Sequence, residues 1–372
     1  MVDSIYGNNK KLNLAKNYQN HQVLLSLISS SISFIYTIFF VLFFLSQNKV
    51  FELNPFLSGI CYFSLYFVSR TLLVFPFQIK QSFQLPKNIG LLSETFFVWL
   101  FNQCKFFILI LFLGSFASGF LLICIQNYPD FWWLFFLILI SCFFVFIFLF
   151  GQTIIAPLFF DFEKLSDARI QNLLMSLKKK IGLGIQSDIW VMKMKEHGDY
   201  ANAFVSGFGL TRKIVITENI LEYDPEEVEC IVAHELAHQF FSHNLLLCIY
   251  KIVSFAGSIY LFKFLLYSEL SYFQTNQLDI SSPNTIGIFL VFLWVLNFLI
   301  SPILLKISRE MEFACDLFAF KHVSSQKCMI SILKKLCVRN FCDPDPTWLV
   351  RIFFCTHPPF SERIERLTSL LK

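Results

Sequence analysis

Six stretches of about twenty or more mainly apolar residues constrain the fold of this chain more than any other feature of its sequence. A bilayer core about 30 Å thick needs roughly 20 apolar residues per helix, so each stretch is long enough to span a membrane. The stretches cover about 22–46, 56–77, 106–126, 131–151, 245–266 and 285–305. The composition agrees, because 56% of the residues are hydrophobic and only 15% are charged, which is far from the balance of a soluble protein. The sequence therefore predicts a mainly α, polytopic membrane protein.

Two polar regions, at about 158–243 and 306–372, remain when the apolar stretches are set aside. Together they are long enough to bury one modest hydrophobic core, and the last two spans lie between them in the sequence. We therefore expect two domains. Residues 1–157 would form an N-terminal region with four transmembrane helices, and residues 158–372 a small α+β domain interrupted by the spans at about 245–266 and 285–305.

Lysine and arginine are distributed unequally between the loops on the two sides of the predicted spans. The loops at 47–55, 127–130 and 267–284 contain a single basic residue, Lys49, whereas the N-terminal segment, the loop at 78–91 and both polar regions contain many. This asymmetry predicts that both termini and the polar domain face the cytosol, in a bacterial inner membrane or the endoplasmic reticulum. The net charge of +4 then reflects topology, so we expect membrane lipids as partners and no nucleic acid.

The first polar region is predicted to form one helix, a small sheet and a second helix. Apolar residues recur at helical spacing from 164 to 181, and Gly182 is placed to end that helix. Short β-like runs follow at 188–192, 203–207 and 213–217. The second helix begins after Asp224, where Pro225 occupies the first helical position and Glu227 lies three residues after the cap, as in a capping box.

This second helix carries the sequence HELAH at 234–238. Residues four apart share a helix face, so His234 and His238 can direct their imidazoles to one point, with Glu235 beside them. The pattern H-E-x-x-H on a helix is typical of zinc metalloproteases, in which the histidines bind the metal and the glutamate activates the attacking water. The alternative is a helix whose polar face is merely hydrated. We expect the helix to continue from Asn244 into the fifth span.

A catalytic zinc site needs a third protein ligand, which must come from another part of the chain. The sequence SREMEFACD at 308–316 follows the last span and is helical in pattern, with Glu312 and Asp316 four residues apart on one face. Taken alone, Glu312 would be a solvated surface residue. Because both helices leave neighbouring spans, we predict instead that Glu312 is the third ligand. Asp316 is placed to accept a hydrogen bond from a ligating imidazole and so to fix the orientation of that ring.

Four ordered blocks within residues 155–372 resemble the integral-membrane zinc metalloproteases that include the type I CAAX prenyl endopeptidases and the bacterial heat-shock membrane proteases. The blocks are ANAFVSGFG at 201–209, HELAH at 234–238, SREMEFACD at 308–316 and THPPFSERIERL at 356–367. The resemblance implies that His234, His238 and Glu312 hold zinc and that Glu235 is the catalytic base. Residues 158–372 are therefore expected to be a zinc metalloprotease domain that acts on a peptide or protein.

The resemblance also assigns roles to residues of the first and last blocks. Asn202 and Ala203 resemble the family's edge strand, which pairs with an extended substrate by strand addition; the alternative is an ordinary edge strand with a turn asparagine. His357 and Arg363 resemble residues near the family's active site, where a donor can stabilise the oxyanion; a histidine before two prolines is otherwise a loop residue.

Two further polar residues near these blocks are interpreted differently. Arg309 is a candidate structural partner for the carboxylates of its own helix. His243 follows His234 by nine residues, which places it off the ligand face, so we expect it at the surface or at the membrane interface.

The number of spans separates the two branches of the family. The resemblance implies seven spans around an intramembrane chamber for the CAAX branch and four spans for the heat-shock branch. Six spans are nearer to the CAAX branch, with its first helix missing. We therefore predict a CAAX prenyl protease-like zinc metalloendopeptidase whose helices surround a chamber and whose substrate is prenylated. A membrane-protein quality-control protease and a catalytically silent membrane scaffold are the alternatives.

Overall fold

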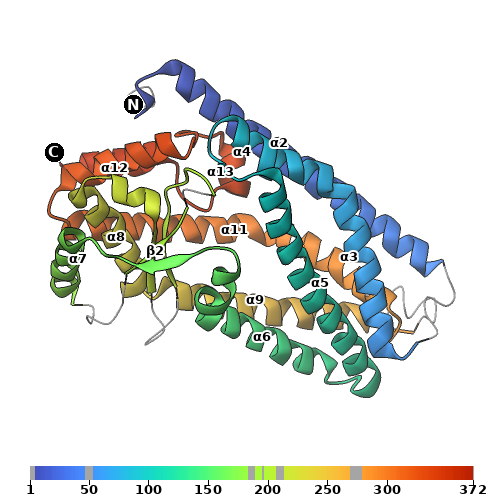
Figure 1. The fold of residues 1–372 in the computed structure, drawn as a ribbon. Coiled ribbons are helices and arrows are strands. Elements are labelled where there is room, and N and C mark those ends of the chain that lie inside the picture. Colours follow the sequence, from blue (N-terminus) through green and yellow to red (C-terminus); the bar gives the residue numbers. More distant parts are fainter. Residues whose placement is uncertain are drawn as a thin grey trace.

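The computed structural model describes residues 5–46, 53–182, 189–194, 197–206, 213–268 and 279–371. The predicted strand ends at Asp188 and Gly207, and the outer-loop Lys49, lie outside these ranges. The fold is mainly helical, with one small sheet at the end of the molecule where both chain termini lie (Figure 1). The helices are α2 (Asn9–Leu45), α3 (Pro55–Ile79), α4 (Leu85–Asn88), α5 (Phe96–Asn127), α6 (Trp132–Phe150), α7 (Ala168–Ile181), α8 (Pro225–Phe240), α9 (His243–Leu266), α11 (Asn284–His322), α12 (Gln326–Arg339), α13 (Trp348–Phe354) and α14 (Phe360–Ser369).

Six helices of the described chain are long and apolar enough to cross a membrane, which confirms the predicted fold class. They are α2, α3, α5, α6, α9 and α11. Several extend beyond the apolar stretches of the sequence, because polar caps set where they begin. Asn54 accepts a hydrogen bond from the amide of Leu57 at the start of α3, and Thr95 accepts one from Val98 at the start of α5.

Helices α3 and α5 pack in close contact at two glycines. A β-carbon on Gly59 would lie 2.7 Å from the Cα of Gly119, and one on Gly119 would lie 2.7 Å from the carbonyl oxygen of Phe56. No heavier residue fits such a crossing without movement of a backbone. Small residues of this kind let membrane helices pack closely where the hydrophobic effect contributes little.

Helix α11 runs without interruption from the membrane part into the polar domain (Figure 1). It contains Pro302, which has no amide hydrogen to donate to the carbonyl of Phe298 one turn earlier. The hydroxyl of Ser301 donates to that carbonyl oxygen at 3.3 Å, so the polar group is satisfied within the helix. The block at 308–316 is thereby carried on the same rigid helix as the sixth span.

Four short strands form the sheet, in the order β1-β2-β4-β3. They are β1 (Phe162–Lys164), β2 (Ile189–Met192), β3 (Ala203–Ser206) and β4 (Lys213–Thr217). Strand β2 is parallel to β4, and the other two pairs are antiparallel. Ile214 and Ile216 of β4 are fully buried against α7 and α8, in the main core of the polar domain. Strand β1 was not predicted, and β3 lies at an edge as expected.

The start of α8 differs in part from the predicted capping box. Asp224 occupies the cap position and Pro225 the first turn, but the Asp224 side chain makes no capping hydrogen bond. Glu227 turns away from the cap and is buried against α12, where it accepts hydrogen bonds from Ser331 at 2.8 Å and Lys335 at 2.7 Å. The capping-box prediction was wrong because this long-range pair competes for the same carboxylate.

The prediction that the HELAH helix continues into the fifth span was also wrong. Helix α8 ends at Phe240, and Ser242 has a left-handed backbone with φ of 55° before α9 begins at His243. A non-glycine residue seldom adopts this conformation, so it marks a defined turn between two helices. The HELAH helix and the fifth span are therefore separate elements.

The N-terminal segment packs against the C-terminal part of the polar domain. The hydroxyl of Tyr6 donates to the carbonyl oxygens of Cys337 at 3.1 Å and Cys342 at 2.9 Å. Gln19, in the first half of α2, accepts a hydrogen bond from the amide of Asp343 at 2.7 Å. Both ends of the chain consequently lie on the same side of the membrane part (Figure 1).

Candidate metal and peptide-binding site

Three predicted metal ligands converge from α8 and α11. Nε2 of His234 lies 3.1 Å from Oε2 of Glu312, and Nε2 of His238 lies 3.4 Å from Oε1 of the same carboxylate. One ligand atom from each of the three residues can be chosen so that all lie within 4.8 Å of one another. Two imidazole nitrogens and a carboxylate are a donor set that suits a catalytic metal ion. The residues present therefore fit the metal that the sequence predicts.

A buried carboxylate and a buried guanidinium lie behind His234. Nδ1 of His234 is 2.9 Å from Oδ1 of Asp316, and Asp316 accepts hydrogen bonds from Nε and Nη2 of Arg363 at 2.7 and 2.6 Å. Burial by itself lowers the pKa of His234, but the contacts with Asp316 and Glu312 raise it to about 10. The ring is thus held between two carboxylates, one on each side.

The structure places Arg363 differently from the other predicted residues of its block. Its guanidinium is buried and engaged with Asp316, whereas the side chain of His357 is 64% exposed at the mouth of the site. Nδ1 of His357 lies 2.9 Å from Oε2 of Glu312. Both residues line the pocket, and they differ in that Arg363 is engaged with Asp316 whereas His357 is exposed.

Glu235, the predicted base, lies between the two histidines in sequence and lines the same pocket. Burial raises the pKa of its carboxyl group, and the nearby imidazoles of His234 and His238 oppose this rise. A carboxylate in this position can accept a proton from a molecule in the pocket.

His243 is not the surface or interfacial residue that its position off the ligand face predicts. It is buried, and its Nδ1 lies 3.0 Å from Nδ1 of His238 and 3.5 Å from Sγ of Cys315. The prediction assumed one continuous helix; the turn at Ser242 instead redirects the chain and brings His243 back toward His238. Only knowledge of this turn would have identified the contact.

Arg309 is not a partner of the carboxylates as predicted. Its Nη1 donates to the carbonyl oxygens of Arg351 at 2.8 Å and Cys355 at 2.9 Å. It therefore joins α11 to the end of α13 and to the loop that precedes His357. Sequence patterns do not indicate these backbone acceptors, because they lie more than forty positions away along the chain.

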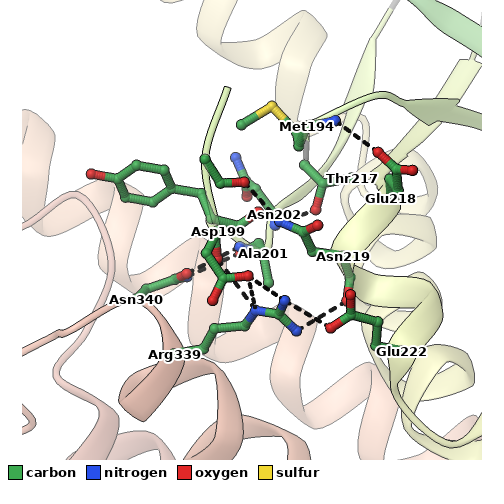
Figure 2. Close-up of polar contacts among 12 residues, drawn as sticks. Met194, Asp199, Ala201, Asn202, Thr217, Glu218, Asn219, Glu222, Arg339 and Asn340 are labelled. Carbon is green, nitrogen blue, oxygen red and sulfur yellow. Dashed lines mark hydrogen bonds and ion pairs between the residues drawn. The ribbon is translucent and has the colours of Figure 1, made fainter. Parts of the chain in front are cut away.

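The predicted substrate residues lie at the same pocket as the ligands. A cavity of about 340 Å³ is lined by Asn202 and Ala203 together with His234, Glu235 and Glu312. The segment before β3 is held by side chains of other elements (Figure 2). Asn340 donates to and accepts from the backbone of Ala201, and Arg339 contacts Asp199 and Glu222. Sequence reasoning missed both Arg339 and Asn340, which lie in no recognised motif.

Comparisons with known proteins match both parts of the chain. The sequence model of peptidase family M48 matches residues 164–371, and the model described as CAAX prenyl protease N-terminal, five membrane helices, matches residues 6–161. Four of the candidate spans in the described chain lie within residues 6–161.

Individual relatives support the same grouping. The chain is 24% identical to the human CAAX prenyl protease 1 homolog over 340 residues, which cover 79% of this chain and 70% of that protein. It is 26% identical to the uncharacterized metalloprotease YhfN of Bacillus subtilis over 65% of this chain, but spans only 57% of that protein. The crystal structure of S. mikatae Ste24p has the same fold, with a TM-score of 0.77 at 19% identity, over 97% of this chain and 89% of that one.

Proposed function

Because the chain belongs to peptidase family M48, we propose that it is a membrane-embedded zinc metalloendopeptidase of the CAAX prenyl protease type. The observation that carries the proposal is the convergence of His234, His238 and Glu312, two of which line a pocket beside an edge strand, in a protein with six candidate spans. A metal-binding pocket that also offers a free strand edge suits the hydrolysis of an extended peptide.

Zinc would be held by His234, His238 and Glu312, and when bound it supplies Lewis-acid polarisation of the scissile carbonyl and activation of water. Glu235 takes a proton from the water as the water oxygen bonds to the carbonyl carbon. It then gives this proton to the leaving amine as the carbon–nitrogen bond breaks. The burial that raises the pKa of Glu235 makes it a stronger base than an exposed glutamate and so suits this exchange.

The remaining residues orient the reacting groups. Asp316, itself held by Arg363, keeps the ring of His234 turned toward the metal position. His357 is exposed at the pocket mouth and donates a hydrogen bond to the developing oxyanion of the substrate. Arg363 assists by holding Asp316.

The substrate lies along β3, with its backbone paired to the free edge beside Asn202 and Ala203. A prenyl group on the peptide would enter the membrane part, in a chamber between the spans, while the two polar regions, at about 158–243 and 306–372, and both termini face the cytosol. This arrangement gives a physical reason for building a protease into a membrane, because a lipid-modified peptide tail resides at the bilayer surface.

The test uses matched farnesylated and unprenylated peptides that end in a CAAX sequence, presented to the purified full-length protein. We expect cleavage of the farnesylated peptide, and we expect a zinc chelator or Glu235→Gln to abolish it. If the protein cleaves unprenylated, unfolded membrane proteins but not the farnesylated peptide, it is a quality-control protease instead. Absence of stoichiometric zinc after purification and dialysis against zinc would indicate a catalytically silent protein.

A further inference from the structure

The free edge of β3 is shorter than its sequence suggests. The carbonyl oxygen of Asn202 accepts a hydrogen bond from the amide of Thr217 at 2.8 Å, so this carbonyl faces β4. Successive carbonyls of an extended chain point in opposite directions. The backbone groups of Ala201, Ala203 and Val205 therefore face the outer edge, where an added strand would pair.

Asn340 occupies both outward groups of Ala201. Its Oδ1 accepts from the Ala201 amide at 3.1 Å, and its Nδ2 donates to the Ala201 carbonyl oxygen at 3.0 Å (Figure 2). One amide side chain thus replaces the partner strand at this position. The adjacent Arg339 fixes the same segment, because its Nε donates to Oδ1 of Asp199 at 3.1 Å.

Asn244 occupies the outward carbonyl at the other end. Its Nδ2 donates to the carbonyl oxygen of Val205 at 2.7 Å. Asn244 lies in the first turn of α9, immediately after the left-handed turn at Ser242, so the turn between the two helices delivers this side chain to the strand. Among the described residues, no side chain and no backbone group outside the sheet forms a hydrogen bond with the amide or the carbonyl of Ala203.

We infer that Asn340 and Asn244 are specificity-determining end stops that leave one acceptor, the carbonyl of Ala203, for the backbone of the substrate. An added strand presents amides to its neighbour at every second residue, and carbonyls 201, 203 and 205 would each accept one of them. With the outer two already bonded, the described part of the strand, which ends at Ser206, binds only one substrate amide. The site therefore takes a short extended peptide segment, with no requirement for a long β-strand. This inference rests on the proposed strand addition at β3.

The test is a backbone N-methyl scan of a peptide that the wild-type protein cleaves, with binding measured on zinc-loaded, full-length Glu235→Gln protein. Methylation removes one amide donor at a time. In this parent protein we expect a single position at which methylation weakens binding, by about tenfold. Two sensitive amides spaced two residues apart in the parent would overturn the inference. If no peptide is cleaved by the wild type, the proposed function fails before the scan begins, so the two failures are distinct.

Variants made in the Glu235→Gln protein sharpen the test. Asn340→Ala should add a second sensitive amide two residues from the first, and Asn244→Ala should add one two residues away on the opposite side. In Asn340→Asp the side chain can still accept from the Ala201 amide but can no longer donate to the Ala201 carbonyl. This variant should therefore give the same binding profile as Asn340→Ala, while Ala201 stays bonded through its amide. Asn54→Ala, an asparagine cap at the start of α3, should leave the profile unchanged. A profile identical to that of the parent in both Asn340 variants would overturn the role of Asn340.

Discussion

Nδ1 of His234 lies 2.9 Å from Oδ1 of Asp316, so the first histidine of the HELAH motif is turned by a carboxylate that belongs to the sixth span's helix. Asp316→Asn keeps the shape of the side chain but removes its charge. We expect zinc affinity to fall by about 10–100-fold, because partners of ligating histidines usually contribute this much. Competition with a chromogenic chelator measures the change. Asp345→Asn alters an exposed aspartate and serves as the control; equal affinities in the two variants would contradict the assignment.

Glu312 is the residue on which the ligand set most depends. Glu312→Ala should remove both zinc and proteolysis, since two histidines alone make a poor zinc site. Metal analysis of the dialysed protein and peptide cleavage are the two measurements. Glu310→Ala changes an exposed glutamate two positions earlier on the same helix and should retain both. Retained zinc in Glu312→Ala would mean that the third ligand is another residue.

His243 gives a prediction that the sequence alone did not. Its Nδ1 contacts Nδ1 of His238, the ring nitrogen opposite the one that faces Glu312. We expect His243→Ala to lower zinc affinity by about 10–100-fold, because His238 loses the partner that fixes its ring. His21→Ala, at an exposed histidine of α2, is the matched control. An unchanged dissociation constant for zinc in His243→Ala would show that the contact has no role in ligand orientation.

The crossing of α3 and α5 predicts a stability effect far from the site. Gly59→Ala places a methyl group 2.7 Å from the backbone of Gly119, so we expect the free energy of unfolding to fall by about 1–3 kcal/mol. Gly257→Ala, on α9, is the control, because a β-carbon there meets nothing within 4 Å and alanine favours a helix. Thermal unfolding in detergent, read out by size-exclusion chromatography, compares the two. Equal melting temperatures would mean that the helices separate at little cost.

The sequence predicted the features that depend on local spacing. The six spans follow from runs of apolar residues, and the grouping of His234 with His238 follows from helical geometry. Glu312 could be predicted because it lies beyond a span that neighbours the HELAH helix. The contacts of Glu227, His243 and Asn340 could not, since each depends on which distant element packs against it. The turn at Ser242 was missed because serine carries no signal for a left-handed backbone.

The uninterrupted α11 makes the geometry of the site sensitive to the thickness of the lipid around it. Glu312 lies about 42 Å from the start of this helix, so a change of about 5° in tilt about that end would move the carboxylate by about 4 Å. The histidine ligands lie on α8, which the turn at Ser242 separates from the fifth span, so no continuous helix passes a tilt of that span to them. Transmembrane helices tilt when their apolar length and the bilayer do not match. Acyl-chain length would then act on the enzyme as a modulator of its rate, without any lipid entering the active site.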